Sequence, residues 1–239
     1  MLNINKFHND RDVWMQARKA ECISLLGDPE AAINLLEQLL VKKDHWTIHK
    51  TIFQMKIDLK YYDEGLGHAF MAALTKDPPD KKINLYYKIG QVLEMKKEYK
   101  YALMHYVFVK QIRVEKKWNI PSELIQCIDR LSVKDEIKTD NLHMQLRDYW
   151  VSQKILISKR FEGFIMKFLP NGKAGFIKVK NNSYYFRTSS ILSLKKDVFK
   201  DVKVSFSLVD SFDIKKGIST KEAVDILLTE DKEKNNGKK

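Results

Sequence analysis

The stretch Glu162–Ile191, EGFIMKFLPNGKAGFIKVKNNSYYFRTSSI, determines how we expect the last third of the chain to fold. Runs of β-branched and aromatic residues, which suit a pleated surface, alternate in it with Pro-Asn-Gly and Asn-Asn, which suit tight turns. The pattern predicts three short strands, Phe164–Phe168, Ala174–Lys180 and Tyr184–Arg187.

Successive side chains of a strand point to opposite faces, so each predicted strand divides its residues between two surfaces. On the second strand, Phe176 and Lys178 share a face opposite Ile177. On the third strand, Tyr185 lies opposite Phe186. Two strands therefore offer faces that mix aromatic rings with cations. This combination is typical of proteins that bind single-stranded nucleic acids, because rings stack on bases and cations neutralise phosphates.

These residues resemble a cold-shock domain, a small five-stranded OB-type barrel that binds single-stranded RNA or DNA. The family's Lys-Gly-Phe-Gly-Phe-Ile strand is matched by Gly172–Ile177, and its Lys-Trp-Phe strand end by Met166–Phe168. Its Val-Phe-Val-His-Phe strand, followed by Ser-Ala-Ile, is matched by Tyr184–Ile191. The resemblance continues through a fourth and a fifth predicted strand, Val202–Asp210 and Glu222–Leu227.

The chain departs from this family at three positions of the base-stacking platform. Lys167 stands where the family has a Trp, and Ala174 and Thr188 stand where it has Phe. Each stacked base contributes about 1–3 kcal/mol, so the loss of three rings weakens stacking. The nucleic-acid-binding residues predicted for this chain are Lys167, Phe168, Lys173, Phe176, Lys178, Tyr185 and Arg187. A barrel that is kept only for protein contact is the alternative, because OB folds host several functions.

The chain carries a net charge of +12, and the excess of cations is concentrated in the predicted barrel. Residues 159–228 hold 14 Lys/Arg and 7 Asp/Glu, and residues 159–191 alone hold seven cations and one acid. Phosphate neutralisation supplies most of the non-specific affinity for nucleic acids, so this distribution favours a polyanion as partner. A basic surface without a partner is the other interpretation.

The length of 239 residues suggests one or two domains, and a hydrophobic content of 44% is enough for packed cores. No apolar run approaches the roughly 18–20 residues of a membrane span, and the N-terminus lacks the apolar core of a signal peptide. Cys22 and Cys127 both lie in apolar helical patterns and are expected to be reduced. We therefore expect a cytoplasmic protein without a membrane partner.

Residues 1–131 are predicted to form paired helices with a recurring spacing. Small residues that let two helices approach closely, Ala32, Gly65 and Ala102, lie 33 and 37 positions apart. This pattern resembles tetratricopeptide repeats, which have a period of about 34 residues and stack as helix pairs into a solenoid.

The remaining segments complete the predicted domain organisation. Residues 132–158 are expected to form a linker with a connecting amphipathic helix, and residues 229–239, which are charged and rich in Asn, a disordered tail. The predicted fold class is therefore α+β with two domains. An all-α helical-repeat solenoid comes first, and a C-terminal five-stranded OB-type β-barrel follows over residues 159–228.

The sequence gives little support for catalysis or for a bound metal. It has no phosphate-binding Gly loop, no nucleophile elbow and no metal-binding His-Glu pair. His45 and His49 have a spacing that suits one metal ion, but no third His or Cys lies near them in the sequence. We expect neither an enzyme nor a metal or other cofactor. A nuclease built on scattered carboxylates stays open as an alternative.

The first helices of the pairs are expected to line a groove that carries Lys50, Gln54, Tyr87 and Gln91, a polar surface suited to a peptide. A solvated face that binds nothing is the alternative. The sequence thus predicts a non-enzymatic adaptor. Its barrel binds single-stranded RNA or DNA, with RNA favoured, and its repeats recruit a protein partner. The competing hypothesis is a protein-interaction scaffold whose barrel has lost nucleic-acid binding.

Overall fold

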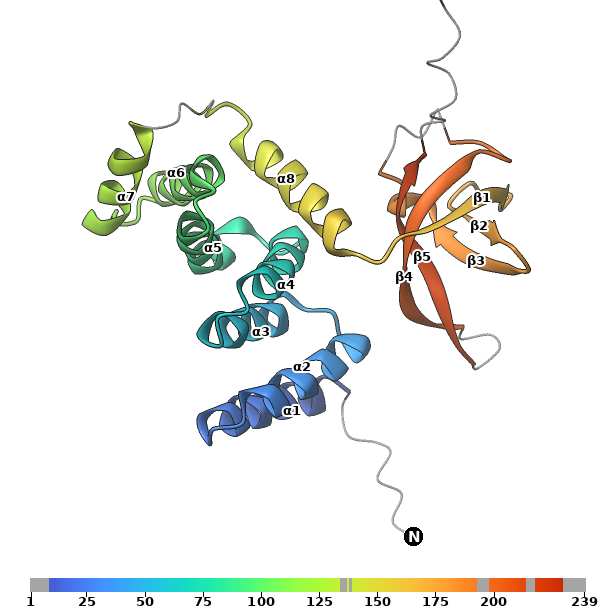
Figure 1. Cartoon of the computed structure of the whole chain (residues 1–239), viewed down its shortest axis with the longest axis horizontal. Coiled ribbons are helices and arrows are strands. Elements are labelled where there is room, and N and C mark those ends of the chain that lie inside the picture. The colour runs from blue at the N-terminus through green and yellow to red at the C-terminus, as the bar shows by residue number, and fades with distance from the viewer. Residues whose placement is uncertain (1–8, 134–136, 138, 193–197, 214–217, 230–239) are drawn as a thin grey trace, which may run out of the picture. The chain divides into compact units, whose positions relative to one another are not determined.

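The fold class is α+β, as predicted, with helices in the first part of the chain and a closed five-stranded barrel in the last (Figure 1). The computed structural model describes residues 9–133, 137, 139–192, 198–213 and 218–229. The chain divides into two compact units, Met1–Leu156 and Ile157–Lys239. The predicted disordered tail lies outside the described residues, apart from Thr229.

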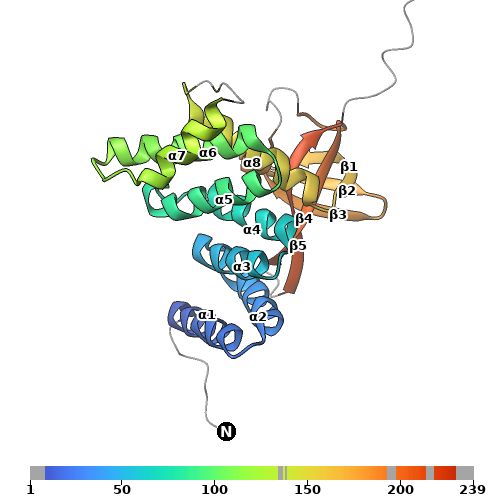
Figure 2. The same ribbon diagram turned by 60° about the vertical axis from the view of Figure 1, so that its left-hand side comes forward.

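The helical unit is built from hairpins of neighbouring helices that stack one after another. In both views the helices follow one another from α1 and α2, through α3 and α4, to α5 and α6 (Figures 1 and 2). The helices are α1 (Asn9–Leu25), α2 (Pro29–Lys42), α3 (Trp46–Asp58), α4 (Tyr62–Leu74), α5 (Ile83–Met95), α6 (Tyr99–Glu115), α7 (Ser122–Ser132) and α8 (Leu142–Ile157), with a 3-10 turn η1 (Pro79–Lys82) before α5. None of the described helices is long and apolar enough to cross a membrane.

The small residues that marked the repeat in the sequence lie where two helices of a hairpin meet. Ala32 and Ala102 are fully buried. A Cβ atom added to Gly65 would lie 3.0 Å from Ile57 Cδ1 of the preceding helix, closer than side chains normally pack. The spacing of small residues thus reflects close helix packing, which supports the prediction of helical repeats.

Helix α8 belongs to the helical unit, although the sequence suggested a helix within a linker. Trp150 has no exposed surface, and its ring stacks on Tyr86 of α5 with centroids 5.3 Å apart. Leu142, Leu146 and Tyr149 are buried in the same core. The helical unit therefore continues to Leu156, well beyond residue 131.

The five strands of the barrel follow the order β1-β2-β3-β5-β4 and close through pairing of β4 with β1. All neighbouring strands are antiparallel except β3 and β5, which are parallel. The strands are β1 (Phe161–Phe168), β2 (Ala174–Val179), β3 (Asn182–Arg187), β4 (Lys203–Asp213) and β5 (Ile218–Leu228). All five strands predicted from the sequence are present, and β1, β3 and β5 begin earlier than expected.

The barrel encloses an apolar core to which alternate residues of the strands contribute. Its buried members include Ile165, Ile177, Phe186, Val204, Phe206, Ala223 and Ile226. Gly175 lies beside this core, where an added Cβ would be 2.5 Å from Lys167 O and 2.6 Å from the Phe186 ring. Only a glycine therefore permits β1, β2 and β3 to approach this closely.

Arg160, just before β1, forms hydrogen bonds at a β-bulge between β4 and β5. The pairing of Ser205 with Leu227 and of Ser207 with Val224 leaves an extra residue on β5. Arg160 Nη1 donates to Asp225 O at 2.8 Å, and Nη2 donates to Ser205 Oγ at 2.8 Å. The guanidinium thus satisfies the carbonyl oxygen of Asp225 in the bulge and links it to the side chain of Ser205 on β4.

Candidate nucleic-acid interface

Four side chains form an outer row across the barrel, one each from β1, β2, β3 and β5. Lys167 pairs with Phe176, Phe176 with Tyr185, and Tyr185 with Glu222. Residues directly opposite one another on adjacent strands point to the same face of a sheet. Their sequence neighbours Ile177, Phe186 and Ala223 are buried in the core, so the outer row faces outwards.

The aromatic centre of the outer row is formed by Phe176 and Tyr185, both of which remain partly exposed. The two rings meet edge to face, with centroids 5.9 Å apart and an interplanar angle of 72°. Lys167 Nζ lies 5.7 Å from the centroid of Phe176, within the range of a cation–π contact. Phe176, Tyr185 and Lys167, all predicted as binding residues, thus lie together on one surface.

A second row runs beside the first. Lys178 is exposed on β2 and pairs with Phe164 of β1, whose ring is 52% exposed. Lys173 is exposed in the turn that leads into β2. The sequence predicts Phe164 on a strand but not as a binding residue. The burial of its neighbour Ile165 is the signal that it faces outwards.

Phe168 does not join the outer row, contrary to its predicted place at the edge of the platform. Its ring packs edge to face on the buried Phe186, with centroids 5.6 Å apart. The register between β1 and β2 shifts between Ile165 and Lys167, which turns Lys167 outwards and Phe168 inwards. Phe168 is therefore partly buried and packs against the barrel core.

Arg187 and Glu222 form an ion pair at the end of the outer row. Arg187 Nε lies 3.3 Å from Glu222 Oε1, and the Glu222 side chain is only 11% exposed while that of Arg187 is 65% exposed. The charge of Arg187 is thus partly balanced by a carboxylate. Sequence analysis missed this carboxylate, because it reaches the platform only through the parallel pairing of β3 with β5.

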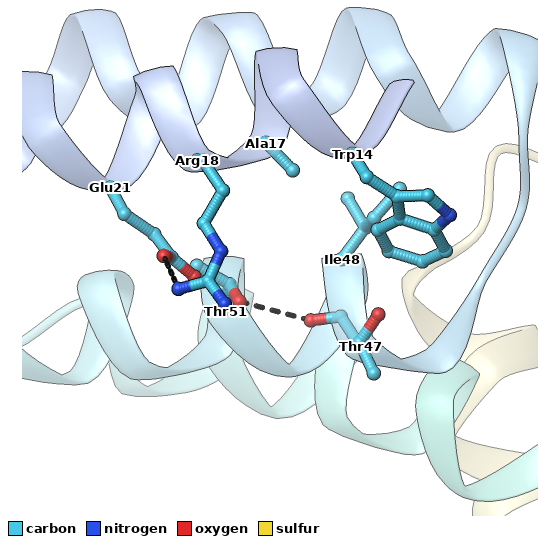
Figure 3. A pocket seen from close by; sticks show the side chains of 7 residues that line it. All are labelled: Trp14, Ala17, Arg18, Glu21, Thr47, Ile48 and Thr51. Carbon is cyan, nitrogen blue, oxygen red and sulfur yellow. Dashed lines mark hydrogen bonds and ion pairs between the residues drawn. The ribbon is translucent and has the colours of Figure 1, made fainter. Parts of the chain in front are cut away.

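The helical unit contains a pocket of about 340 Å³ between α1 and α3, shown in Figure 3. An indole, two threonine side chains and an ion pair line it: the residues are Trp14, Ala17, Arg18, Glu21, Thr47, Ile48 and Thr51. Trp14 meets His45 edge to face at 4.9 Å, and Arg18 Nη1 lies 3.4 Å from Glu21 Oε2. The pocket combines an aromatic wall with hydroxyl and charged groups.

The four predicted groove residues do not converge on one pocket. Tyr87 lines a pocket of about 290 Å³ formed with residues of α6 and α7, but Lys50, Gln54 and Gln91 line neither of these two pockets. Lys50 is exposed on α3, and Gln54 Nε2 donates to Asp58 Oδ1 at 2.8 Å on the same helix. Sequence spacing placed these residues on successive helices but could not identify the hollows between them.

His45 and His49 take part in separate contacts. The His45 ring accepts a hydrogen bond from Thr47 N at the start of α3. His49 Nδ1 lies 3.0 Å from His68 Nδ1, and His49 Nε2 lies 3.0 Å from Asp44 Oδ1. Burial, with charge from His49 and Lys56, lowers the pKa of His68 to about 3. Among the residues that the structure describes, no three His, Cys, Asp or Glu side chains are placed to hold a metal ion.

Comparisons with known proteins identify a structural neighbour but no family. No family model matches the chain, and no curated protein matches it. The chain is similar to a solved structure described as the crystal structure of MamA protein, with a TM-score of 0.43 and 16% sequence identity. That likeness covers 61% of this chain and 70% of the MamA chain.

Proposed function

We propose that this protein is a non-enzymatic adaptor that binds single-stranded nucleic acid, RNA in preference to DNA, through the outer row of its barrel. The observation that carries the proposal is the convergence of Lys167, Phe176 and Tyr185 on adjacent strands. Aromatic rings stack on bases without regard to sequence, and a cation beside them neutralises the backbone. Together they match the two repeating features of a single strand.

The charge of the surrounding surface supports the same partner. Lys173 and Lys178 are exposed near the two rings, and residues 159–191 carry seven cations and one acid. Clustered cations raise the local concentration of a polyanion and contribute affinity through release of its counterions. Because only two rings remain in the outer row, electrostatic attraction supplies a larger part of the binding energy than it does on a platform with all its rings.

The helical unit supplies the second half of the proposal, recruitment of a protein partner. The pocket between α1 and α3 offers Trp14 as an aromatic wall and Thr47 and Thr51 as polar groups (Figure 3). A hollow with one large apolar surface and a few polar groups suits a peptide side chain. This pocket, rather than the four residues predicted from the repeat spacing, is the candidate contact for the partner.

Ring substitutions in the full chain test the nucleic-acid half of the proposal. Phe176→Ala and Tyr185→Ala should each weaken binding to a short RNA single strand by about 1–3 kcal/mol, because each removes a stacking surface. Phe199→Ala is the matched control, since Phe199 is an exposed ring outside the outer row. Fluorescence anisotropy of a labelled strand gives the dissociation constants.

The competing hypothesis is a scaffold whose barrel contacts only protein. It would be favoured if Phe176→Ala and Tyr185→Ala bound RNA as the control does, while circular dichroism showed all three variants folded. Equal effects of all three substitutions would likewise argue against a specific stacking platform on the outer row.

A further inference from the structure

The outer row ends in a carboxylate, which is unexpected on a surface that binds a polyanion. Glu222 pairs with Tyr185 on one side and with Val209 of β4 on the other. Its side chain is 11% exposed and held by Arg187 Nε at 3.3 Å from Oε1. Like charges repel, so an acid here disfavours a nearby phosphate. Because Glu222 lies beside Tyr185, it is better placed to contact the edge of a base that stacks on this ring.

The ion pair with Arg187 determines which oxygen of Glu222 can accept a hydrogen bond from a base. Arg187 lies on the side of Oε1, and among the described residues no side chain pairs with Oε2. An ionised carboxylate only accepts hydrogen bonds. A base stacked on Tyr185 therefore meets an acceptor at Glu222 and a donor at Arg187, on adjacent parts of one surface.

Cytosine and uracil differ in how they meet this acceptor. Cytosine carries an amino group at C4, which donates to a carboxylate, whereas uracil carries a carbonyl oxygen at the same position. Single-stranded bases present these Watson–Crick edges freely to a protein. The two bases also differ at N3, which accepts a hydrogen bond in cytosine and donates one in uracil. The order of donor and acceptor along this edge is therefore reversed between two pyrimidines that stack similarly on Tyr185.

From this geometry we infer that Glu222 is a specificity-determining residue, which makes the barrel prefer single strands containing cytosine over those containing uracil. The inference rests on the proposed function, since it assumes that a base stacks on Tyr185. Glu222 accepts a hydrogen bond from the amino group of the base, and Arg187 holds the carboxylate in place and balances its charge.

The test compares labelled oligocytidine and oligouridine, each of about eight nucleotides, with the full chain near neutral pH. Wild-type protein should bind oligocytidine about tenfold more tightly, as expected for one hydrogen bond to a charged acceptor. Glu222→Gln should bring the two dissociation constants together, because the amide both donates and accepts. Glu162→Gln is the matched control. It removes the same charge from an exposed carboxylate paired with Lys203, and it should leave the ratio unchanged.

A second experiment changes the oligonucleotide and keeps the wild-type protein, so its result does not depend on whether a variant folds. An oligonucleotide of pyrimidin-2-one ribosides differs from oligocytidine only in lacking the amino group, so wild-type protein should bind it more weakly than oligocytidine. Equal wild-type affinity for oligocytidine and oligouridine would overturn the inference, and so would a cytosine preference that survives in folded Glu222→Gln. Absence of saturable binding to every strand would instead contradict the proposed function itself.

Discussion

Lys167 and Phe168 are neighbours in the sequence, but the barrel uses them for different purposes. The register shift in β1 turns Lys167 towards Phe176 on the outer row and Phe168 towards Phe186 in the core. A one-residue irregularity in a strand exchanges the faces of the residues that follow it. Substitutions at these adjacent positions should therefore change different properties.

Phe168→Ala should lower the stability of the barrel without removing a stacking surface. The expected loss in the free energy of unfolding is about 3 kcal/mol, because the ring packs on the core residue Phe186. Chemical denaturation measures this loss. RNA affinity, measured where the variant is still folded, should stay close to that of the wild type. If Phe168→Ala weakened RNA binding as much as Tyr185→Ala does, Phe168 would be a base-stacking residue and this prediction would be wrong.

The alternation of side chains was sufficient to predict that Phe176 and Lys178 lie opposite Ile177 and that Tyr185 lies opposite Phe186, because period two needs only local sequence. The place of Phe168 was predicted from the resemblance to a strand end instead, and nothing in the local pattern marks the register shift in β1. Glu222 could not be predicted from alternation either. Its place beside Tyr185 depends on pairing between strands that are far apart in the chain.

Helix α8 is attached to the helical unit through a buried polar contact as well as through apolar packing. Trp150 Nε1 donates to His105 Nε2 at 2.9 Å. His105 Nδ1 lies 2.7 Å from Tyr101 O, and a carbonyl oxygen only accepts, so Nδ1 carries the proton. His105 must therefore be neutral for both hydrogen bonds to exist. Burial lowers the pKa of His105 to about 4.

This requirement predicts a pH dependence of stability. Unfolded His105 has a pKa near 6.5, above its folded value, so its contribution is complete above pH 6.5 and falls as the pH drops towards 4. The loss amounts to about 3 kcal/mol over that window. His105→Gln, which cannot take up a proton there, should show a smaller change in unfolding free energy by denaturation. An identical pH profile in both proteins would remove His105 as the cause.

At the same scale, α8 shows where a sequence pattern is insufficient. Its helical periodicity was clear, and so was its apolar face. The surface that covers this face could not be predicted, because Tyr86 and His105 lie far away in the sequence. The polar residues between α7 and α8 resemble a domain boundary. The compact unit nevertheless continues across them to Leu156.

On the scale of the whole molecule, the chain joins two units with separate cores and different surfaces. The helical unit presents the pocket with Trp14, and the barrel carries the larger share of the excess positive charge relative to its length. Separate surfaces allow one protein to hold two different partners at once. The proposed adaptor role needs both surfaces, and nucleic-acid binding by the barrel is its central claim.

Binding of wild-type full chain to a labelled RNA single strand, measured by anisotropy across a series of salt concentrations, tests that claim most directly. The account predicts saturable binding at low salt. It also predicts a logarithm of affinity that falls linearly with the logarithm of salt, with a slope of about −2 to −3 if three or four phosphates are neutralised. Absence of saturable binding at the lowest salt would contradict the account and leave a protein-interaction scaffold in its place.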